Sequence, residues 1–426
     1  MRVLVIGGGA REHALVEALA RSPQVTRIFC APGNPGTALL TQNMPVGADS
    51  VAAIQELGRW ALEQVIDLTV VGPELPLALG IVDEFRALGL PIVGPTKAAA
   101  RIESSKSWAR DFMRRHGIPS PVYQVTQTAE ELRAYLAEAE FPLVLKADGL
   151  AGGKGAVVAR TLADAREALH GMAQAGILGE GEGRGTVVCE EFLVGREVSA
   201  HAFTDGRAVV QMPPACDYKL LLDGDQGPMT GGMGGYSPAS WVNEEMWAEV
   251  AATVLRPAVA GMASEGCPFT GFLYAGLMMT ADGPRVLEFN ARLGDPEAQL
   301  LLPRLESDLA EILLAIFQER LHEIASDIRW SADATCGVVL ASEGYPAQAL
   351  TGRPITGLDD LPDGVTAFHA GTRIEPNGSR IVSSGGRVLT LVGRAPTLED
   401  ARRLVYTAVP RVSFDGAHHR TDIGLL

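Results

Sequence analysis

Two lysines bracket a glycine-rich segment near the middle of the chain. The segment KADGLAGGKG, residues 146–155, lies between apolar runs at residues 142–145 and 156–159, which have the length of buried strands. A loop joining two such strands could fold over a polyphosphate, because its glycines let backbone N–H groups approach the oxygens while Lys146 and Lys154 neutralise charge. It is not a Walker A loop, since no Ser or Thr follows Lys154 and no helix begins there. The alternative is a glycine-rich hairpin with surface lysines.

Glu288, Asn290 and Arg292 alternate along a second strand-like run, so their side chains share one face while the intervening apolar residues face the core. A carboxylate and an amide oxygen suit Mg²⁺, which takes oxygen ligands. Arg292 supplies a planar fork for a carboxylate or phosphate. A polar edge strand facing solvent is the alternative, but the polar turn at residues 294–297 favours a metal site.

A third apolar run ends in Glu190, Glu191, Phe192 and Leu193. Such a strand end could offer backbone groups to the edge of an adenine, and Glu197 could offer a carboxylate to a ribose. A strand end with two solvated glutamates is the default alternative.

Three glycines follow the first expected strand and precede Arg11, Glu12 and His13. A dinucleotide-binding loop is disfavoured, because Glu12 stands where a glycine should and no acid follows about 20 residues later. A helix that begins after glycines still binds a simple phosphate, with Gly33 and Asn34 at the end of the neighbouring strand. His13, one turn into this helix, is as readily a buried structural residue as a catalytic one.

Asp217 and Lys219 precede a segment rich in glycine, residues 227–236. So many glycines cost backbone entropy, which a cradle around a small substrate would justify. A flexible lid is the alternative, and the two are compatible. The sequence contains no HExxH or GxSxG motif, so metalloprotease and serine-hydrolase chemistry have no support.

The composition is that of an ordinary globular protein. Of 426 residues, 47% are hydrophobic and 20% charged, and the net charge of −15 argues against general binding to nucleic acids or anionic membranes. The five cysteines form no CxxC pair, so we expect a reducing, cytoplasmic setting rather than disulfides or zinc. The chain begins with a strand rather than a signal peptide, and no apolar run is long enough to span a membrane.

Three domains are expected from the order of these signals. Residues 1–102 alternate strands and helices, which predicts a parallel α/β domain with ligands at the carboxyl ends of its strands. Residues 103–325 mix helices with longer strands and include a mobile lid at about 122–192. Residues 326–426 predict a small α+β domain.

The motifs in this order resemble those of ATP-grasp ligases, and more narrowly the phosphoribosylamine–glycine ligase family. The resemblance runs along nearly the whole chain. The segment 146–155 and the Glu-x-Asn-x-Arg pattern indicate only the superfamily, which implies a central two-part ATP-grasp fold. The narrower family is indicated by REHA, APGN, TGGMG and GFLYAGL, at residues 11–14, 31–34, 230–234 and 271–277.

The resemblance implies that ATP drives the joining of glycine to 5-phosphoribosylamine, through glycyl phosphate, to give glycinamide ribonucleotide, ADP and phosphate in de novo purine biosynthesis. The implied metal ligands for Mg²⁺ or Mn²⁺ are Glu288 and Asn290, and the implied catalytic residues are Lys154 and Arg292. The implied ATP-binding residues are Lys106, Lys146, Lys154, Glu190, Glu191, Phe192, Leu193 and Glu197. The implied substrate-binding residues are Gly9, Arg11, Glu12, His13, Gly33, Asn34, Asp217, Lys219, Gly231, Gly232, Met233, Gly234, Arg292, Gly294 and Asp295.

The chain departs from the family pattern in several places. The strand at residues 272–279 lacks the acid that many ATP-grasp enzymes carry there, which leaves the number of metal ions open. Three other functions compete: a related ligase that uses a different amine, a regulatory nucleotide-binding protein without turnover, and a nicotinamide-dependent oxidoreductase. The other departures are Arg196, Leu220, Met229, Ala291 and Leu293.

Overall fold

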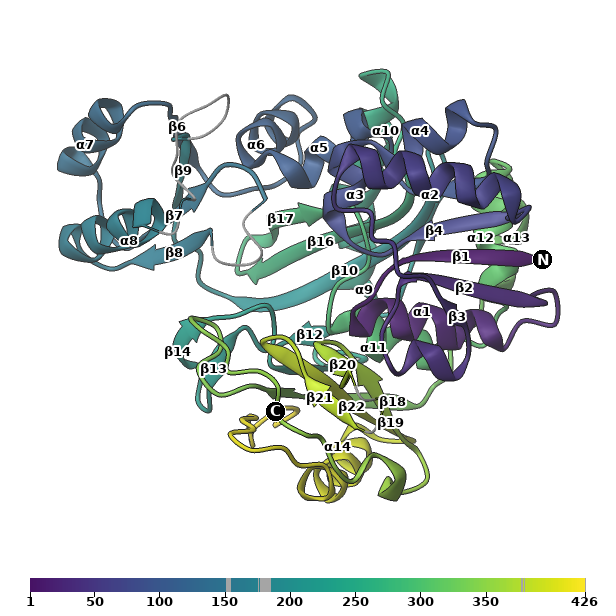
Figure 1. Cartoon of the computed structure of the whole chain (residues 1–426). Helices are drawn as coiled ribbons and strands as arrows, with labels where there is room; N and C mark the ends of the chain where they lie inside the picture. Colours follow the sequence, from purple (N-terminus) through teal and green to yellow (C-terminus); the bar gives the residue numbers. More distant parts are fainter. Residues whose placement is uncertain (151–154, 175, 177–184, 377, 379, 426) are drawn as a thin grey trace.

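The N-terminal part is a five-stranded parallel sheet with helices packed against it (Figure 1). The computed structural model describes residues 1–150, 155–174, 176, 185–376, 378 and 380–425. The strand order is β3-β2-β1-β4-β5, and the first strand is buried along residues 3–6, as a sheet covered on both faces requires. The strands are β1 (Arg2–Gly7), β2 (Arg27–Pro32), β3 (Gln42–Asn43), β4 (Leu68–Val71) and β5 (Ile92–Val93); the helices are α1 (Ala10–Ala20), α2 (Val51–Glu63), α3 (Glu74–Leu79), α4 (Ile81–Ala87) and α5 (Lys97–Ser104).

The centre of the molecule is an antiparallel sheet with the order β11-β10-β16-β17. Helix α12 packs against both β10 and β16. The strands are β10 (Arg196–Asp205), β11 (Val209–Gln211), β16 (Thr270–Thr280) and β17 (Gly283–Asn290). The helices that follow α5 or surround this sheet are α6 (Lys106–Arg115), α9 (Glu244–Val250), α10 (Arg256–Ser264), α11 (Glu297–Leu301), α12 (Leu309–Phe317) and α13 (Leu321–Ile324).

A bulge interrupts the β16–β17 hairpin beside the predicted metal ligands. Gly276 pairs with Glu288 and Leu277 pairs with Val286, which leaves Leu287 without a partner on β16. The prediction that the apolar residues between the polar ones face the core is therefore only half right. Phe289 is buried and belongs to the core, whereas Leu287 is only half-buried and lies outside it, because the extra residue shifts the alternation of side chains.

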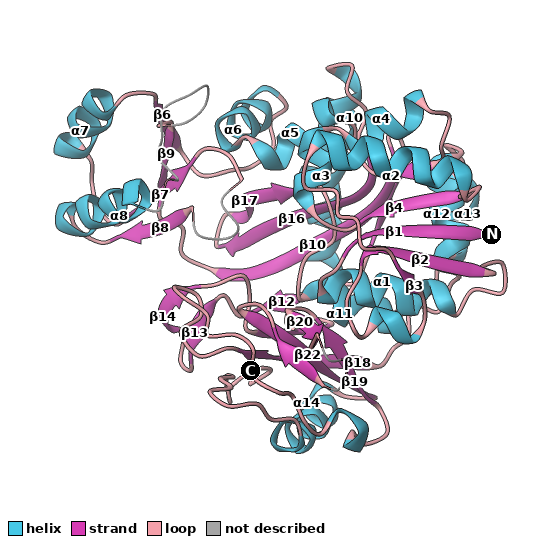
Figure 2. Ribbon diagram, viewed as in Figure 1, coloured by secondary structure: helices cyan, strands magenta, loops and turns pink. Residues whose placement is uncertain are grey.

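A separate four-stranded sheet, β6-β9-β7-β8, stands at one side of the molecule (Figure 2). We call this sheet and its two helices the lid. Its own core contains Leu132, Leu136, Leu145 and Val187. The predicted strand–loop–strand arrangement around residues 146–155 is confirmed by the antiparallel pairing of β7 with β8. The lid elements are β6 (Tyr123–Thr126), α7 (Ala129–Glu138), β7 (Leu143–Ala147), β8 (Ala156–Ala159), α8 (Leu162–Gln174) and β9 (Val187–Glu191).

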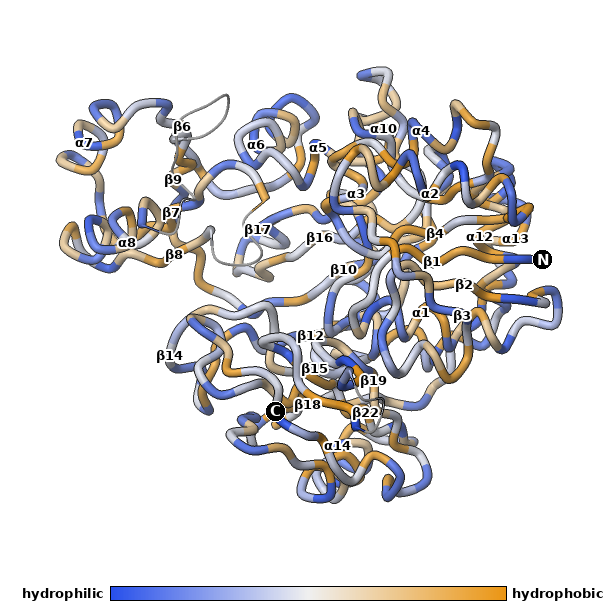
Figure 3. Tube along the Cα trace, viewed as in Figure 1, coloured by the Kyte–Doolittle hydropathy of each residue, from blue (hydrophilic) through white to orange (hydrophobic). Residues whose placement is uncertain are grey.

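The C-terminal sheet has the order β12-β15-β18-β22-β19 and packs against α14. Two of its strands, β12 and β15, belong to the central region, and β15 pairs with β18 across the boundary expected at residue 326. Hydrophobic residues follow β18 and β22 through its interior (Figure 3). The elements are β12 (Cys216–Asp217), β13 (Leu220–Leu222), β14 (Gln226–Met229), β15 (Gly234–Ser237), β18 (Ala334–Ala341), β19 (Val365–His369), β20 (Thr372–Ile374), β21 (Ile381–Ser383), β22 (Arg387–Ala395) and α14 (Leu398–Ala408).

The predicted combination of a parallel α/β domain, a two-part central region and a C-terminal α+β region is confirmed. In the part of the chain that the structure describes, no helix has the length and apolar character needed to cross a membrane.

Candidate active site

One cavity of about 400 Å³ collects charged side chains from every part of the fold. It lies where the lid, the central sheet, the N-terminal loops and the C-terminal sheet meet. Its charged lining residues are Arg11, Glu74, Glu103, Lys106, Arg110, Lys146, Glu190, Glu191, Glu197, Asp217, Lys219, Glu288, Arg292, Asp295, Glu297 and Arg387. Phe192, Leu193 and Gly231 line it as well, so most of the residues predicted to bind ATP or metal come together here. Lys154 lies outside the described residues.

The lid side of the cavity carries a buried ionic cluster. The Glu190 carboxylate accepts hydrogen bonds from Arg110 at 2.6 and 2.8 Å and lies 3.0 Å from the Lys146 ammonium. Burial would raise the pKa of Glu190, but the two cations outweigh it and hold the pKa below its usual value. The carboxylate of Glu190 is thus occupied by protein groups, and its backbone is paired within the sheet with Tyr123 of β6 and Val144 of β7. Arg110 was not found from the sequence, because only the fold brings α6 beside β9.

The bulged strand binds the same cluster through its backbone. The Leu287 carbonyl accepts hydrogen bonds from Lys146 Nζ at 2.7 Å and from Arg110 at 2.6 Å. Lys146 therefore joins the lid to the strand that carries the predicted metal ligands. Its ammonium reaches the cavity wall in a fixed position, as contact with a phosphate requires.

Helix α6 begins at the edge of the glycine-rich loop. Lys106 donates its backbone N–H to Asp148 at 2.6 Å and its ammonium to the Gly149 carbonyl at 2.7 Å. Asp148 also accepts a hydrogen bond from the Ser107 hydroxyl. These contacts fix the start of the loop against the helix N-terminus, where a negative charge is stabilised.

Lys219 lies between two carboxylates on the opposite side of the cavity. Its ammonium is 2.6 Å from Glu197 and 3.2 Å from Asp217. Burial would lower the pKa of Lys219, but these carboxylates raise it well above its ordinary value. Burial also raises the pKa of Asp217, to about 7. The predicted ribose contact Glu197 and the predicted glycine contact Asp217 thus share one lysine in this structure.

Glu288 and Asn290 have the properties of ligands for a divalent cation. Among the described residues, no hydrogen bond or ion pair reaches the Glu288 carboxylate. Burial would raise its pKa, but Lys146, Lys219 and Lys106 lower it, so Glu288 stays ionised. The described residues contain no cluster of three or more His, Cys, Asp or Glu arranged around a metal. The pair Glu288 and Asn290 fits Mg²⁺, which is held by one or two protein oxygens together with phosphates and waters.

The side-chain oxygen and the side-chain nitrogen of Asn290 differ in their hydrogen bonds. Its side-chain oxygen accepts a hydrogen bond from Arg292 at 3.1 Å, whereas its amide nitrogen is buried without a partner in the described structure. A buried, unpaired N–H group is costly, so this nitrogen marks a place where an acceptor such as a phosphate oxygen would complete the site.

Arg292 is held by two carboxylates from the N-terminal side. Its guanidinium lies 3.2 Å from Glu74 and 2.9 Å from Glu103, and it donates to the Leu293 carbonyl at 3.0 Å. Burial would lower its pKa, but Glu103 and Glu74 raise it. Neither carboxylate was predicted. A signal for Glu74 existed, because it follows the carboxyl end of β4, where ligands gather on parallel sheets.

The turn at residues 294–297 is supported from behind by a buried histidine. His201 is fully buried, and its Nε2 accepts a hydrogen bond from the Gly294 backbone at 3.2 Å. Its ring stacks on Tyr274 with 4.2 Å between the centroids. Burial lowers the pKa of His201 to about 4, so the neutral ring acts as an acceptor for the turn at physiological pH.

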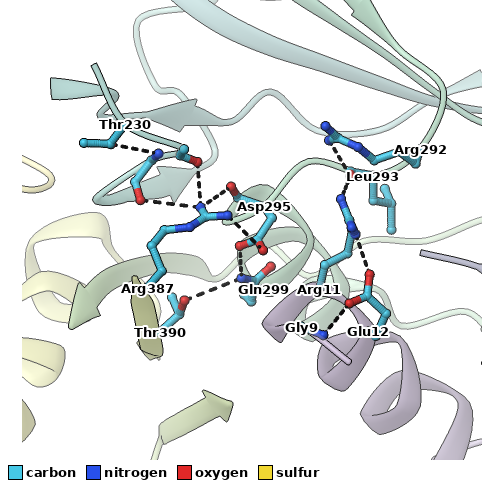
Figure 4. A network of polar contacts seen from close by, with 12 residues as sticks. Gly9, Arg11, Glu12, Thr230, Arg292, Leu293, Asp295, Gln299, Arg387 and Thr390 are labelled. Carbon is cyan, nitrogen blue, oxygen red and sulfur yellow. Dashed lines mark hydrogen bonds and ion pairs between the residues drawn. The ribbon is translucent and has the colours of Figure 1, made fainter. Parts of the chain in front are cut away.

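Asp295 and the glycine-rich loop meet beside the C-terminal sheet (Figure 4). Asp295 forms an ion pair with Arg387 at 3.1 Å and accepts a hydrogen bond from Gln299 at 2.7 Å. Gly231 and Asp295 line the cavity. The predicted substrate contacts Gly232, Met233 and Gly234 lie outside its lining, and Met233 is fully buried.

Hydrogen bonds from residues of helix α1 hold the glycine loop that precedes this helix. Glu12 accepts hydrogen bonds from the Gly9 backbone at 2.6 Å and from Arg11 at 2.7 Å. Arg11 reaches the cavity and donates to the Leu293 carbonyl at 3.3 Å (Figure 4). Of these three residues, only Arg11 presents its side chain to the cavity.

His13 and Asn34 hold the N-terminal domain against the C-terminal strand β19. His13 Nδ1 accepts a hydrogen bond from the His369 backbone at 3.0 Å, and Asn34 donates to the His369 carbonyl at 2.8 Å. Burial lowers the pKa of His13 to about 3. Gly33 lies against Asn43, with which an added Cβ would clash at 2.3 Å. These contacts favour the structural interpretation of His13.

Comparison with known proteins covers almost the whole chain. Family models described as the N domain, the ATP-grasp (A) domain and the C domain of phosphoribosylglycinamide synthetase match residues 1–103, 104–298 and 335–426. The chain is 48% identical to the phosphoribosylamine–glycine ligases of Allochromatium vinosum and Ralstonia nicotianae, over 100% of this chain and 98% and 99% of theirs. It is also similar to the crystal structure of phosphoribosylamine–glycine ligase from Thermotoga maritima, with a TM-score of 0.81, 32% identity and coverage of 99% and 100% of the two chains.

Proposed function

Because the chain belongs to the phosphoribosylglycinamide synthetase family, we propose that it is an ATP-dependent ligase that joins glycine to 5-phosphoribosylamine. The products are glycinamide ribonucleotide, ADP and phosphate, as a step of purine biosynthesis. The cavity carries this proposal: Lys106, Lys146 and Arg292 reach one space together with the carboxylate of Glu288, which no described side chain bonds. An oxidoreductase or a regulatory protein without turnover has no need of that arrangement.

The chemistry begins with an attack of the glycine carboxylate on the γ-phosphorus of ATP, which gives glycyl phosphate and ADP. The amine of phosphoribosylamine then attacks the acyl carbon, phosphate leaves, and the amide forms. Carboxylate and phosphate repel each other, so catalysis is mostly positioning and neutralisation of charge. Lys106 and Lys146 supply cations near the phosphates, and Arg292 supplies one near the glycine carboxylate.

Arg292 needs a qualification in this scheme. Glu74 and Glu103 already pair with its guanidinium, so glycine would meet an arginine whose orientation is fixed by protein carboxylates. We propose that Arg292 contributes a fixed positive charge and a remaining N–H group of its Nη1 atom, rather than a bidentate clamp.

Glu288 and Asn290 are the proposed ligands of a divalent cation, Mg²⁺ or Mn²⁺. When bound, the cation would neutralise charge on the phosphates during transfer. The protein residues hold Glu288 ionised through the three surrounding lysines. The substrates are small molecules, and the five unpaired cysteines support a cytoplasmic setting.

An acyl phosphate hydrolyses in water, so the site has to close. The loop at residues 149–155 is the proposed cover. Lys154, within this loop but outside the described residues, is proposed to contact the phosphates. The Lys154→Ala variant should lose most of the turnover, and a near-normal rate would remove this lysine from the phosphate site.

The decisive assay is ADP release that requires both glycine and phosphoribosylamine. A panel of other amines and amino acids separates this ligase from relatives with other substrates. Glycine labelled with ¹⁸O in its carboxyl group should transfer one labelled oxygen to the released phosphate. Unlabelled phosphate would contradict the acyl-phosphate step while leaving the overall reaction in place.

A further inference from the structure

Arg387, the first residue of β22, bonds to two segments that border the cavity (Figure 4). One guanidinium nitrogen, Nη1, donates to the Gly231 carbonyl and to the Asp295 carbonyl, each at 2.6 Å. The other, Nη2, lies 3.1 Å from the Asp295 carboxylate. A residue of the C-terminal sheet therefore joins the loop at residues 230–234 to the turn at residues 294–297.

A second residue of the C-terminal region also bonds to the backbone of Gly231. The Tyr345 hydroxyl accepts a hydrogen bond from the Gly231 backbone N–H at 2.9 Å. The N–H and C=O of Gly231 thus bond to Tyr345 and Arg387. The Thr230 hydroxyl also accepts from the Gly232 N–H at 3.0 Å and donates to the Lys219 carbonyl at 2.8 Å, which ties the loop to the cavity lysine.

The loop at residues 230–234 packs directly against the turn at residues 294–297, so the two segments cannot move closer together. Gly232 has a φ of +111°, and a Cβ there would lie 2.7 Å from Cδ of Pro296. Their separation is therefore set on one side by this steric contact and on the other by Arg387. Arginine suits the position, because two separate nitrogens of its planar fork bond the carbonyls and the carboxylate, whereas lysine would have to make every contact from one atom.

We propose that Arg387 is a positioning residue for the ligase reaction, which fixes Gly231 and Asp295 at the distance that the substrates require. The inference rests on the proposed function and assigns the C-terminal sheet a part in it. Arg387 acts through Gly231 and Asp295, both of which line the cavity. A displacement of about 1 Å in such a site costs about 100-fold in rate.

The test compares Arg387→Gln with Arg394→Gln. Arg394 is a matched control on the same strand: it pairs with Asp333 at 2.9 Å and donates to the Pro303 carbonyl at 2.6 Å, outside the cavity lining. We expect Arg387→Gln to lower kcat/KM for glycine about 100-fold, while KM for ATP is unchanged. Arg394→Gln should keep wild-type kcat and both KM values, whatever its effect on thermal stability.

Two milder variants keep the inference testable if Arg387→Gln does not fold. Tyr345→Phe removes the hydrogen bond to the Gly231 N–H and leaves the one to the Gly231 carbonyl, and it should lower kcat/KM for glycine several-fold. Arg387→Lys restores the charge without the fork, so it should recover part of the activity and remain below wild type. Wild-type kinetics in both variants would overturn the inference.

The outcomes also separate the inference from the proposed function. A wild-type protein that releases no ADP with glycine and phosphoribosylamine contradicts both. An active wild type with unchanged Arg387→Gln kinetics contradicts only the positioning role. An Arg387→Gln variant in which KM for phosphoribosylamine alone rises would show direct contact with that substrate, and would overturn the role of Arg387 through Gly231 and Asp295.

Discussion

The two walls of the cavity are built in opposite ways. The lid has its own small hydrophobic core, and the bonds described above join it to the main body through the ionic cluster of Arg110, Lys146 and Glu190 and through Lys106. The loop at residues 230–234 continues into β15, which is paired inside the C-terminal sheet, and Arg387 and Tyr345 hold its backbone. One wall thus depends on charges, and the other on a shared sheet and backbone hydrogen bonds.

This difference teaches how one site can admit a large nucleotide and still hold a small amino acid in place. A subdomain that packs on its own core can change its orientation without unfolding. A loop that belongs to a sheet of another region does not depend on the orientation of such a subdomain. We infer that the nucleotide enters beside the lid and that glycine meets a wall that is already formed.

The largest effect on stability is expected in the ionic cluster of the lid wall. Glu190→Gln leaves Arg110 and Lys146 buried without their carboxylate, so it should lower the free energy of unfolding by about 3–5 kcal/mol. Glu191→Gln, the matched control, keeps a side-chain oxygen that can accept the hydrogen bond from the exposed Val122 N–H, which is 2.8 Å long in this structure, and should cost no more than about 0.5 kcal/mol. Urea unfolding followed by circular dichroism measures both. Equal losses would contradict the comparison.

The Glu288 carboxylate should affect activity rather than stability. Glu288→Gln removes the proposed metal ligand, so ADP release should fall at least about 100-fold. This loss is larger than the one typical of residues that only hydrogen-bond to a metal ligand. A higher Mg²⁺ concentration should recover part of it. Asp282→Asn, at the exposed turn of the same hairpin, serves as the control and should retain wild-type activity. Full activity of Glu288→Gln at low Mg²⁺ would exclude the metal role.

Adding a methyl group at Gly232 tests whether the loop at residues 230–234 has to keep its position. Gly232→Ala introduces both a strained φ and a contact of 2.7 Å with Pro296, so it should lower stability by about 1–3 kcal/mol and reduce activity as well. Gly224→Ala has a φ of +69° but no atom within 4 Å of the new Cβ, and should cost about 1–2 kcal/mol with unchanged activity. Thermal melts and ADP assays of the two variants distinguish them. A fully active Gly232→Ala would mean that the loop tolerates displacement.

A dependence of stability on pH is also expected at the interface of the N- and C-terminal regions. Burial lowers the pKa of His13 to about 3 and that of His369 to about 4, from 6.5. Below pH 6.5 the unfolded chain therefore binds more protons than the folded chain. The free energy of unfolding should fall as the pH drops from about 6.5 to about 4.

Urea midpoints measured between pH 7.5 and pH 4 should show this slope, and the double variant His13→Gln, His369→Gln should show less of it. His322→Gln, at an exposed position, is the control. If the double variant keeps the full wild-type slope, other groups cause the pH dependence.

The sequence predicted those parts of the fold that depend on local signals. The parallel N-terminal sheet, the strand–loop–strand at residues 146–155 and the β16–β17 hairpin follow from runs of apolar residues and from turn residues. The clustering of Lys146, Glu288 and Arg292 was also predicted, because each belongs to a recognisable motif, and the family resemblance placed Lys106 with them. Their individual roles stay predictions.

Contacts between distant segments could not be predicted in this way. The partners of Arg292 are 218 and 189 residues away in sequence, and Arg387 reaches a loop 156 residues away. The pairing of β15 with β18 and the bulge at Leu287 likewise depend on how whole elements pack. No local pattern of residue types carries that information.

Hydrogen exchange with and without magnesium and ATP tests the contrast between the two walls most directly. We expect the amides of β7, β8 and β9 to exchange more slowly when the nucleotide is bound. The amides at 231–237, already held by Tyr345 and the C-terminal sheet, should be protected in both states. Unchanged exchange in the lid, or an equal gain of protection at residues 231–237, would contradict the account.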